Sequence, residues 1–201
     1  AGCGLGRIVK HYHYQGYDIS GCDYSSVAVK KLNLNSPELK ITEGDVTNLK
    51  YQNEEFDLIL AFGVFHSIED VHAINKGISE VARCLKVNGN FIVSVRADNI
   101  ESRLIDYITE KRGKKGTCFH KWCFREKEFA AMLTATNFTV NKVDLFTNVP
   151  FLHKFSVFRK NKRVDEKEAR SSGFQLNGIG DIFYKVLKLF FPDSFGTTLV
   201  F

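Results

Sequence analysis

The first half of the chain alternates short apolar runs with stretches of helical spacing. Phe56–Phe62 (FDLILAF) is almost entirely apolar, as expected of a strand that is buried on both faces of a sheet. Glu69–Leu85 follows, and its apolar residues recur on one side of a helix: Val71, Ile74, Ile78, Val81 and Leu85. The turn Asn88-Gly89-Asn90 then leads into a further strand, Phe91–Val95.

Earlier segments repeat this alternation. We expect a helix over Leu5–Tyr14, a strand over Asp18–Asp23, a helix over Val27–Leu32 behind a capping serine, and a strand over Leu39–Glu43. Strands that alternate with helices predict a parallel sheet with right-handed crossovers. The expected fold class is therefore α/β, with a doubly wound, Rossmann-like, mainly parallel sheet.

The second half has fewer strands and an apolar segment near its end. Helices are expected over Ile100–Lys111 and Arg125–Thr136, and a strand over Phe138–Leu145. The apolar helix Ile179–Phe191 allows two interpretations. It packs on the domain, or it lines a pocket for a hydrophobic or lipid-linked substrate or touches a membrane interface. We favour packing with partial pocket lining.

The first seven residues, AGCGLGR, read as a turn between a strand and a helix. Three glycines alternate with small or apolar residues, which suits a backbone that takes positive φ or lies against a ligand. At a strand-to-helix turn of a parallel sheet, this is the nucleotide end of the sheet. The spacing is G-x-G-x-G and differs from the G-x-G-x-x-G of dinucleotide enzymes. Such a turn needs a preceding strand, so we expect the protein to extend upstream.

Polar residues follow the next strands at what should be the same edge of the sheet. Asp23 ends the strand after the glycine turn, where an acid can accept both hydroxyls of a ribose. Asp45 ends the next strand, where it can meet an adenine amino group. Either aspartate alone could be a helix-cap neighbour or a turn residue. Because both fall at one edge, ligand binding is the better interpretation.

Five ordered motifs resemble those of class I S-adenosylmethionine (SAM)-dependent methyltransferases. They are Gly2–Arg7, Gly21–Ser25, Gly44–Val46, Phe56–Ile59 and Arg83–Gly89. The resemblance is strongest to the group that includes ubiquinone and menaquinone biosynthesis methyltransferases, with a type 11-like domain. It covers residues 1–97 well, and 122–146 and 196–201 more loosely. The usual Pro-Gly-Gly after the long helix is replaced by Val87-Asn88-Gly89-Asn90, which changes only a structural turn.

The resemblance implies a single domain over 1–201 and a set of cofactor contacts. Residues 1–97 form the cofactor half and 98–146 the substrate side, and 147–194 is an insertion before a final antiparallel strand at Thr197–Phe201. SAM is the expected cofactor and S-adenosylhomocysteine the product. The residues expected to bind SAM are Gly2, Cys3, Gly4, Gly6, Arg7, Asp23, Tyr24, Ser25, Asp45, Val46, Phe62 and Gly63.

Substrate contacts are expected from Phe65, His66, Arg96, His120 and Trp122. His66 is the best candidate for a catalytic base, although a histidine that packs against the following helix explains it equally well. For Trp122, core packing is about as plausible as substrate contact. Cys118, His120 and Cys123 lack a fourth ligand and the usual C-x₂-C spacing, so no metal is expected.

The composition indicates a cellular compartment and shows that charge is distributed unevenly between the two halves of the chain. Five cysteines without framework spacing favour reduced thiols and a cytoplasmic setting, and no apolar run is long enough to span a membrane. Residues 1–100 carry 10 basic and 12 acidic side chains, whereas residues 101–201 carry 18 and 11. The basic second half could favour an anionic substrate, a membrane surface or RNA.

Three functions remain open. We favour methyl transfer to a small-molecule acceptor that is hydrophobic or anionic. The alternatives are a tRNA-modifying methyltransferase and a non-catalytic SAM-binding protein.

Overall fold

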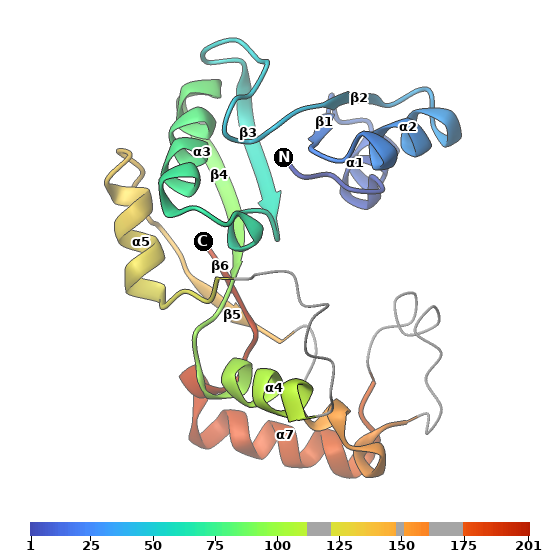
Figure 1. Cartoon of the computed structure of the whole chain (residues 1–201), viewed down its shortest axis with the longest axis vertical. Helices are drawn as coiled ribbons and strands as arrows, with labels where there is room; N and C mark the ends of the chain where they lie inside the picture. The colour runs from blue at the N-terminus through green and yellow to red at the C-terminus, as the bar shows by residue number, and fades with distance from the viewer. Residues whose placement is uncertain (112–121, 148–150, 161–174) are drawn as a thin grey trace.

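The computed structural model describes residues 1–111, 122–147, 151–160 and 175–201 (Figure 1). Hydrogen bonds group the strands into two sheets, one of order β1-β2 and one of order β3-β4-β6-β5. The strands are β1 (Ser20–Asp23), β2 (Lys40–Glu43), β3 (Phe56–Phe62), β4 (Leu85–Arg96), β5 (Asp144–Phe146) and β6 (Thr198–Val200). β1 and β2 are parallel, and so are β3 and β4. β6 runs antiparallel to both of its neighbours, which confirms the predicted α/β fold with one antiparallel strand.

The helices are α1 (Arg7–His13), α2 (Ser26–Asn35), α3 (Val71–Cys84), α4 (Ile100–Lys111), α5 (Glu126–Thr134) and α7 (Gly178–Phe190). Short 3₁₀ helices are η1 (Phe65–Ser67), η2 (Phe151–Lys154), η3 (Ser156–Phe158) and η4 (Pro192–Ser194). Side-chain caps fix two of the helix starts. Ser25 accepts a hydrogen bond from the Ala28 N–H, and Asp70 accepts from the N–H groups of His72 and Ala73.

The main core lies where α3 packs against β3 and β4. Ile74, Ile78 and Val81 of α3 are fully buried, as their helical spacing predicts. Each such side chain contributes about 1.5–3 kcal/mol by leaving water. On the strands, Ala61 and Val93 are also fully buried. This core therefore fixes the ends of β3 and β4 relative to α3.

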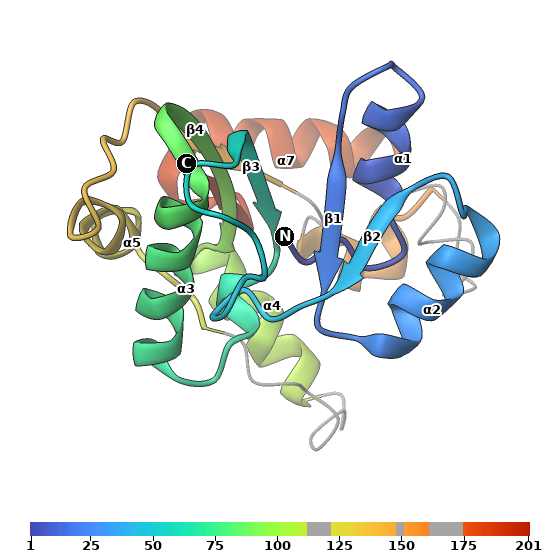
Figure 2. The ribbon, with the colours of Figure 1, turned by 90° about the horizontal axis from the view of Figure 1, so that it is seen from above.

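The prediction that both faces of Phe56–Phe62 are buried is wrong. Leu58 is 47% exposed and Phe62 is 41% exposed. Within the described part of the chain, β3 is an edge strand, and its outer edge faces β1 across a cavity of about 1270 Å³ that we call the inter-sheet slot. The N-terminus lies between β1 and β3 (Figure 2). The expected strand before the glycine turn stays a prediction. Such a strand would bind between β1 and β3, where the inter-sheet slot lies.

The first residues bridge the two sheets. The Ala1 amino group donates to the Leu60 carbonyl of β3 at 2.7 Å, and the Cys3 N–H donates to the Cys22 carbonyl of β1 at 2.9 Å. These two bonds place the glycine turn beside the carboxyl ends of β1 and β3.

Two predicted strands differ from the structure by more than one or two residues in their bounds. β4 begins at Leu85 rather than Phe91, because the Asn88 turn, with φ of 63°, is accommodated as an irregularity within the strand. β5 begins at Asp144, and Phe138 instead packs its ring against Phe91 at 5.4 Å between centroids. In neither case is the order of elements changed.

α4 and the later part of the chain form a small cap, which also contains η2, η3, α7 and η4. Its buried cluster contains Leu152, Tyr184 and Phe195. The Tyr184 hydroxyl donates to Glu101 Oε2 at 2.6 Å, and the Phe151 N–H donates to Glu101 Oε1 at 2.8 Å. β3 and β4 run toward this cap (Figure 1). Among the described residues, no helix is long and apolar enough to cross a membrane.

Candidate cofactor-binding site

The glycine turn is shaped by three left-handed residues with different surroundings. Gly2, Gly4 and Gly6 have φ of 67°, 53° and 74°, where a side chain is disfavoured. A Cβ on Gly6 would lie 2.6 Å from Leu32 Cδ2, so Gly6 lets α1 pack closely on α2. A Cβ on Gly2 would lie 2.3 Å from Val64 Cγ2. A Cβ on Gly4 would meet nothing within 4 Å, so open space lies beside the middle of the turn.

Asp23 joins this turn to the start of α2 through its two carboxylate oxygens. Oδ2 accepts the Gly4 N–H at 2.6 Å, and Oδ1 accepts the Ser25 N–H at 2.9 Å. The two bonds fix the carboxylate between the glycine turn and the start of α2. A carboxylate has about four lone-pair sites, so two remain for further donors such as ribose hydroxyls.

Asp45 lies at the next strand end. The Gly44 N–H donates to the Asp23 carbonyl at 3.0 Å, which places the two carboxylate-bearing turns side by side. Asp45 itself is exposed, and its Oδ1 accepts the Thr47 N–H at 2.8 Å in a local turn. The carboxylate therefore lies at the surface, where a ligand donor can reach it.

Of the other expected cofactor contacts, some are at the surface and one is in the core. Arg7 is exposed, and so is Tyr24 at 80%. Val46 is buried in the main core, so its backbone rather than its side chain borders the turn. Burial and the nearby Asp23 raise the pKa of the Cys3 thiol to about 11, which keeps it neutral.

The loop after β3 completes the edge of the site. Gly63 has φ of 77°, and its N–H donates to the Ser94 carbonyl at 3.2 Å and to Ser94 Oγ at 3.1 Å. The Val64 side chain then contacts Gly2 of the glycine turn. Sequence analysis missed Ser94 and Val64. A serine within the apolar strand FIVSVR was the available signal for Ser94.

The structure does not support substrate contact by the Phe65 side chain. It is fully buried, with its ring 6.1 Å from that of Phe91 and 6.3 Å from that of Phe129. The helical turn of η1 directs this side chain inward, against α3 and α5. His66, the next residue, is half-buried.

Trp122 lies beside the His66 loop. Its backbone N–H donates to the His66 carbonyl at 2.8 Å, and its indole N–H donates to the Glu69 carbonyl at 3.2 Å. Trp122 therefore braces the loop after β3. It packs against the main core and is partly exposed.

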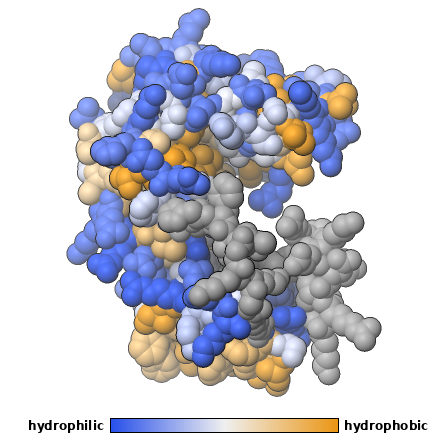
Figure 3. All heavy atoms as spheres, in the orientation of Figure 1, coloured by the Kyte–Doolittle hydropathy of each residue, from blue (hydrophilic) through white to orange (hydrophobic). Residues whose placement is uncertain are grey.

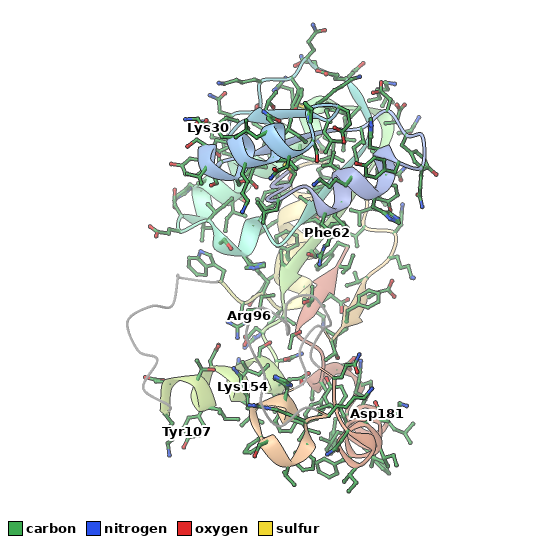
Figure 4. All side chains as sticks on the ribbon, turned by 90° about the vertical axis from the view of Figure 1, so that its right-hand side faces the viewer. Lys30, Phe62, Arg96, Tyr107, Lys154 and Asp181 are labelled. Carbon is green, nitrogen blue, oxygen red and sulfur yellow. The ribbon has the colours of Figure 1, made fainter. Side chains whose placement is uncertain are left out.

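Arg96 lies at the carboxyl end of β4, between Phe62 and the cap residues Lys154 and Asp181 (Figure 4). Its guanidinium donates to Asp106 Oδ1 at 2.6 Å and to the Ser102 carbonyl at 3.3 Å. It thus holds α4 in place, which sequence analysis did not predict.

The remaining expected substrate residue, His120, lies outside the described residues, as does Cys118. Within the described ranges, no group of three or more His, Cys, Asp or Glu side chains could hold a metal ion.

Comparison with known proteins agrees with this geometry. Residues 1–93 match a family model described as a methyltransferase domain. Residues 1–93 are therefore similar to the methyltransferase domains of this family. The demethylmenaquinone methyltransferase of Paenarthrobacter aurescens is 27% identical over 92 residues, which are 45% of this chain and 35% of that protein. The human probable tRNA methyltransferase 9B is 30% identical over 102 residues, which are 51% of this chain and 22% of that protein.

Solved structures show the same methyltransferase fold over nearly the whole chain. A SAM-dependent methyltransferase from Mesorhizobium loti has a TM-score of 0.64 at 16% identity, over 99% of this chain and 86% of its own. The geranyl diphosphate C-methyltransferase of Streptomyces coelicolor, solved with S-adenosylhomocysteine, also has a TM-score of 0.64 at 16% identity, over 99% and 68%. The chain spans about a third or less of the length of the curated relatives named above.

SAM is the cofactor of the SAM-dependent methyltransferases to which the chain is similar, and the residues present fit it. Open space lies beside Gly4, the Asp23 carboxylate is oriented with spare acceptor sites, and the Asp45 carboxylate is exposed. SAM carries no phosphate, so the site requires backbone approach and hydroxyl acceptors rather than a lysine.

Proposed function

We propose that this protein transfers the methyl group of SAM to a small-molecule acceptor. The observation that carries the proposal is the Asp23 carboxylate, which is held by Gly4 and Ser25 beside an open glycine turn. When bound, SAM supplies a methyl group on a sulfonium that is already activated toward nucleophiles. The protein therefore contributes chiefly proximity, alignment and exclusion of water.

Each group at the site has a proposed part. The backbone of Gly2–Gly6 lies along the methionyl portion of the cofactor, Asp23 accepts the ribose hydroxyls, and Asp45 accepts the adenine amino group. His66 takes the proton of a hydroxyl acceptor, whereas an acidic acceptor needs no base. The bond from the Trp122 N–H to the His66 carbonyl supports this assignment, because it keeps the loop after β3 at the mouth of the site.

The acceptor class is supported from two sides. One relative is by name a demethylmenaquinone methyltransferase, and one structural neighbour is a geranyl diphosphate methyltransferase. Both acceptors are small molecules with a hydrophobic chain, and geranyl diphosphate is also anionic. The tRNA alternative rests on the similarity to the probable tRNA methyltransferase 9B and on the basic second half of the chain.

Methyl-labelled SAM tests these alternatives. The protein is incubated with labelled SAM and either a solvent-extractable metabolite fraction or a tRNA fraction. Label in the first fraction supports the proposal, whereas label only in tRNA supports the alternative and rejects a small-molecule acceptor. SAM binding with no transfer to either fraction identifies a non-catalytic protein. At a SAM concentration near the wild-type Kd, Asp23→Ala should strongly reduce transfer, and Asp18→Ala, at the opposite end of the same strand segment, should leave it unchanged.

A further inference from the structure

The helix α7 has an inner face that packs on the cap and an outer face that is apolar yet exposed. Gly180 and Tyr184 are buried on the inner side, where Leu187 also packs against the cap cluster. The outer residues are Ile179 (73% exposed), Ile182 (66%), Phe183 (47%), Val186 (45%), Leu189 (77%) and Phe190 (71%). We call these six residues the outer face of α7. They show as an apolar band along the lower edge of the molecule (Figure 3).

The outer face is a continuous stripe. At 3.6 residues per turn, its six side chains fall within an arc of about 120° that contains no polar residue of α7. Asp181, Lys185 and Lys188 fall outside this arc. A soluble surface rarely exposes large apolar side chains in so regular a row without a partner.

The neighbouring segment η3 enlarges the same apolar region. Phe158 of η3 stacks on Phe183, with 6.1 Å between ring centroids and 6° between planes. The Asn177 side-chain amide also donates to the Val157 carbonyl at 2.7 Å, which fixes η3 beside the start of α7. Val157 is itself 69% exposed.

The charged residues around this region are mainly basic. Within 151–160 and 175–195 there are five basic side chains, Lys154, Arg159, Lys160, Lys185 and Lys188, and only two acidic ones, Asp181 and Asp193. Asp181 is already paired with Lys185 at 2.7 Å. The segments that form and flank the outer face therefore carry net positive charge, which complements a negatively charged partner. Lys188 itself reaches the Thr147 hydroxyl at 3.4 Å, on the other side of the helix.

We propose that the outer face of α7 docks on an anionic membrane surface, with the helix axis in the plane of the interface. An apolar stripe with basic residues beside it is the arrangement that binds such a surface, because burial of the apolar side chains and attraction to anionic headgroups add together. A second copy of the chain fits less well, since a two-fold contact through this stripe would bring the basic rims of both copies together. This inference is independent of the proposed function.

Docking would also set the orientation of the molecule. The strands β3 and β4 run toward the cap that carries α7 (Figure 1). The membrane would then lie at the same end of the molecule as the carboxyl ends of these strands.

Vesicle flotation of the full chain tests the proposal. The chain should float with vesicles of mixed phosphatidylglycerol and phosphatidylcholine, and much less with phosphatidylcholine alone. The double variant Ile182→Ser/Leu189→Gln should bind the anionic vesicles at least about tenfold more weakly. The matched control is Val27→Ser/Leu34→Gln on α2, whose side chains are 75% and 83% exposed, and it should float like the wild type. Lys185→Gln should weaken binding about fivefold.

Two readouts keep the result interpretable. In Leu189→Trp, the indole emission should shift to shorter wavelength when anionic vesicles are added. This readout reports binding directly and does not depend on a variant that loses it. Sedimentation velocity in the absence of lipid reports whether the same face joins two copies. The proposal is overturned if the wild type does not float, if the outer-face variant floats as well as the control, or if the Trp emission does not move. The proposal is likewise overturned if the wild type is a dimer that does not float and the outer-face variant is a monomer.

Discussion

Replacing Asp23 by alanine removes the group on which the cofactor site depends. The Gly4 and Ser25 N–H groups lose their shared acceptor, at 2.6 and 2.9 Å, and the cofactor loses its ribose partner. Both N–H groups are near the surface, so water can replace the carboxylate there. We therefore expect the free energy of unfolding to fall by only about 1 kcal/mol. Cofactor binding should suffer more.

The effect on binding follows from the charge of the lost acceptor. Hydrogen bonds to a charged group contribute about 1.5–3 kcal/mol each, and partial exposure of Asp23 brings the expected loss to about 1–3 kcal/mol. This corresponds to about a 5- to 150-fold weaker Kd for S-adenosylhomocysteine.

Isothermal titration with S-adenosylhomocysteine measures this change, and urea unfolding measures the stability loss separately. Asp18→Ala is the matched control, because Asp18 is exposed and pairs with Lys40 on the surface. The reasoning is refuted if Asp23→Ala binds within about twofold of the wild type while remaining folded. Equal weakening by Asp18→Ala would also refute it.

Three further changes test other parts of the structure. The free energy of unfolding should be lower in Gly6→Ala than in Gly4→Ala by more than about 1 kcal/mol, because a Cβ on Gly6 meets Leu32 and a Cβ on Gly4 meets nothing. Gly4→Ala should mainly weaken the binding of S-adenosylhomocysteine. Thermal melts measure the first effect and titration measures the second. Burial raises the pKa of Glu101, so the stability it contributes is present at low pH and is lost as pH rises through its folded pKa. As pH rises above the ordinary range of a glutamate carboxyl, urea unfolding should therefore show a smaller loss of stability in Glu101→Gln than in the wild type, and an equal loss would contradict this. Arg83→Met should destabilise by about 2 kcal/mol in urea unfolding, since the guanidinium binds Glu80 and the carbonyls of Leu49 and Tyr51, and an effect below about 0.5 kcal/mol would show that water replaces these bonds.

Hydrophobic periodicity predicts the bounds of elements that have a single clear period along their length. The bounds of Phe56–Phe62 and Ile100–Lys111 agree with β3 and α4 to the residue, because each is a clear run of one period between polar or turn residues. The burial of β3 is not predictable in this way. Whether Leu58 and Phe62 are covered depends on a neighbouring strand, which is a property of the sheet and not of the local pattern.

The candidate site is predictable in position but not in its bonding. The glycine spacing and the acids at strand ends place Gly4, Asp23 and Asp45 at one edge, where the structure brings them together. Long-range partners carry no local signal. The bond of Trp122 to the His66 carbonyl and the inward turn of Phe65 arise only when separate elements pack.

α7 illustrates the same limit. Its apolar residues predict a helix that packs on the domain, lines a pocket or touches a membrane interface, and the inner face does pack on the cap. The lining of a substrate pocket stays a prediction. The outer face is exposed because the cap is only one layer deep on that side, which the spacing of apolar residues does not encode.

A crystal structure of the protein with S-adenosylhomocysteine tests the central claim most directly. The account predicts that both ribose hydroxyls donate to the Asp23 carboxylate, with the amino acid portion of the ligand beside Gly4. A ligand that lies elsewhere, with Asp23 bonded only to the Gly4 and Ser25 N–H groups, would contradict it.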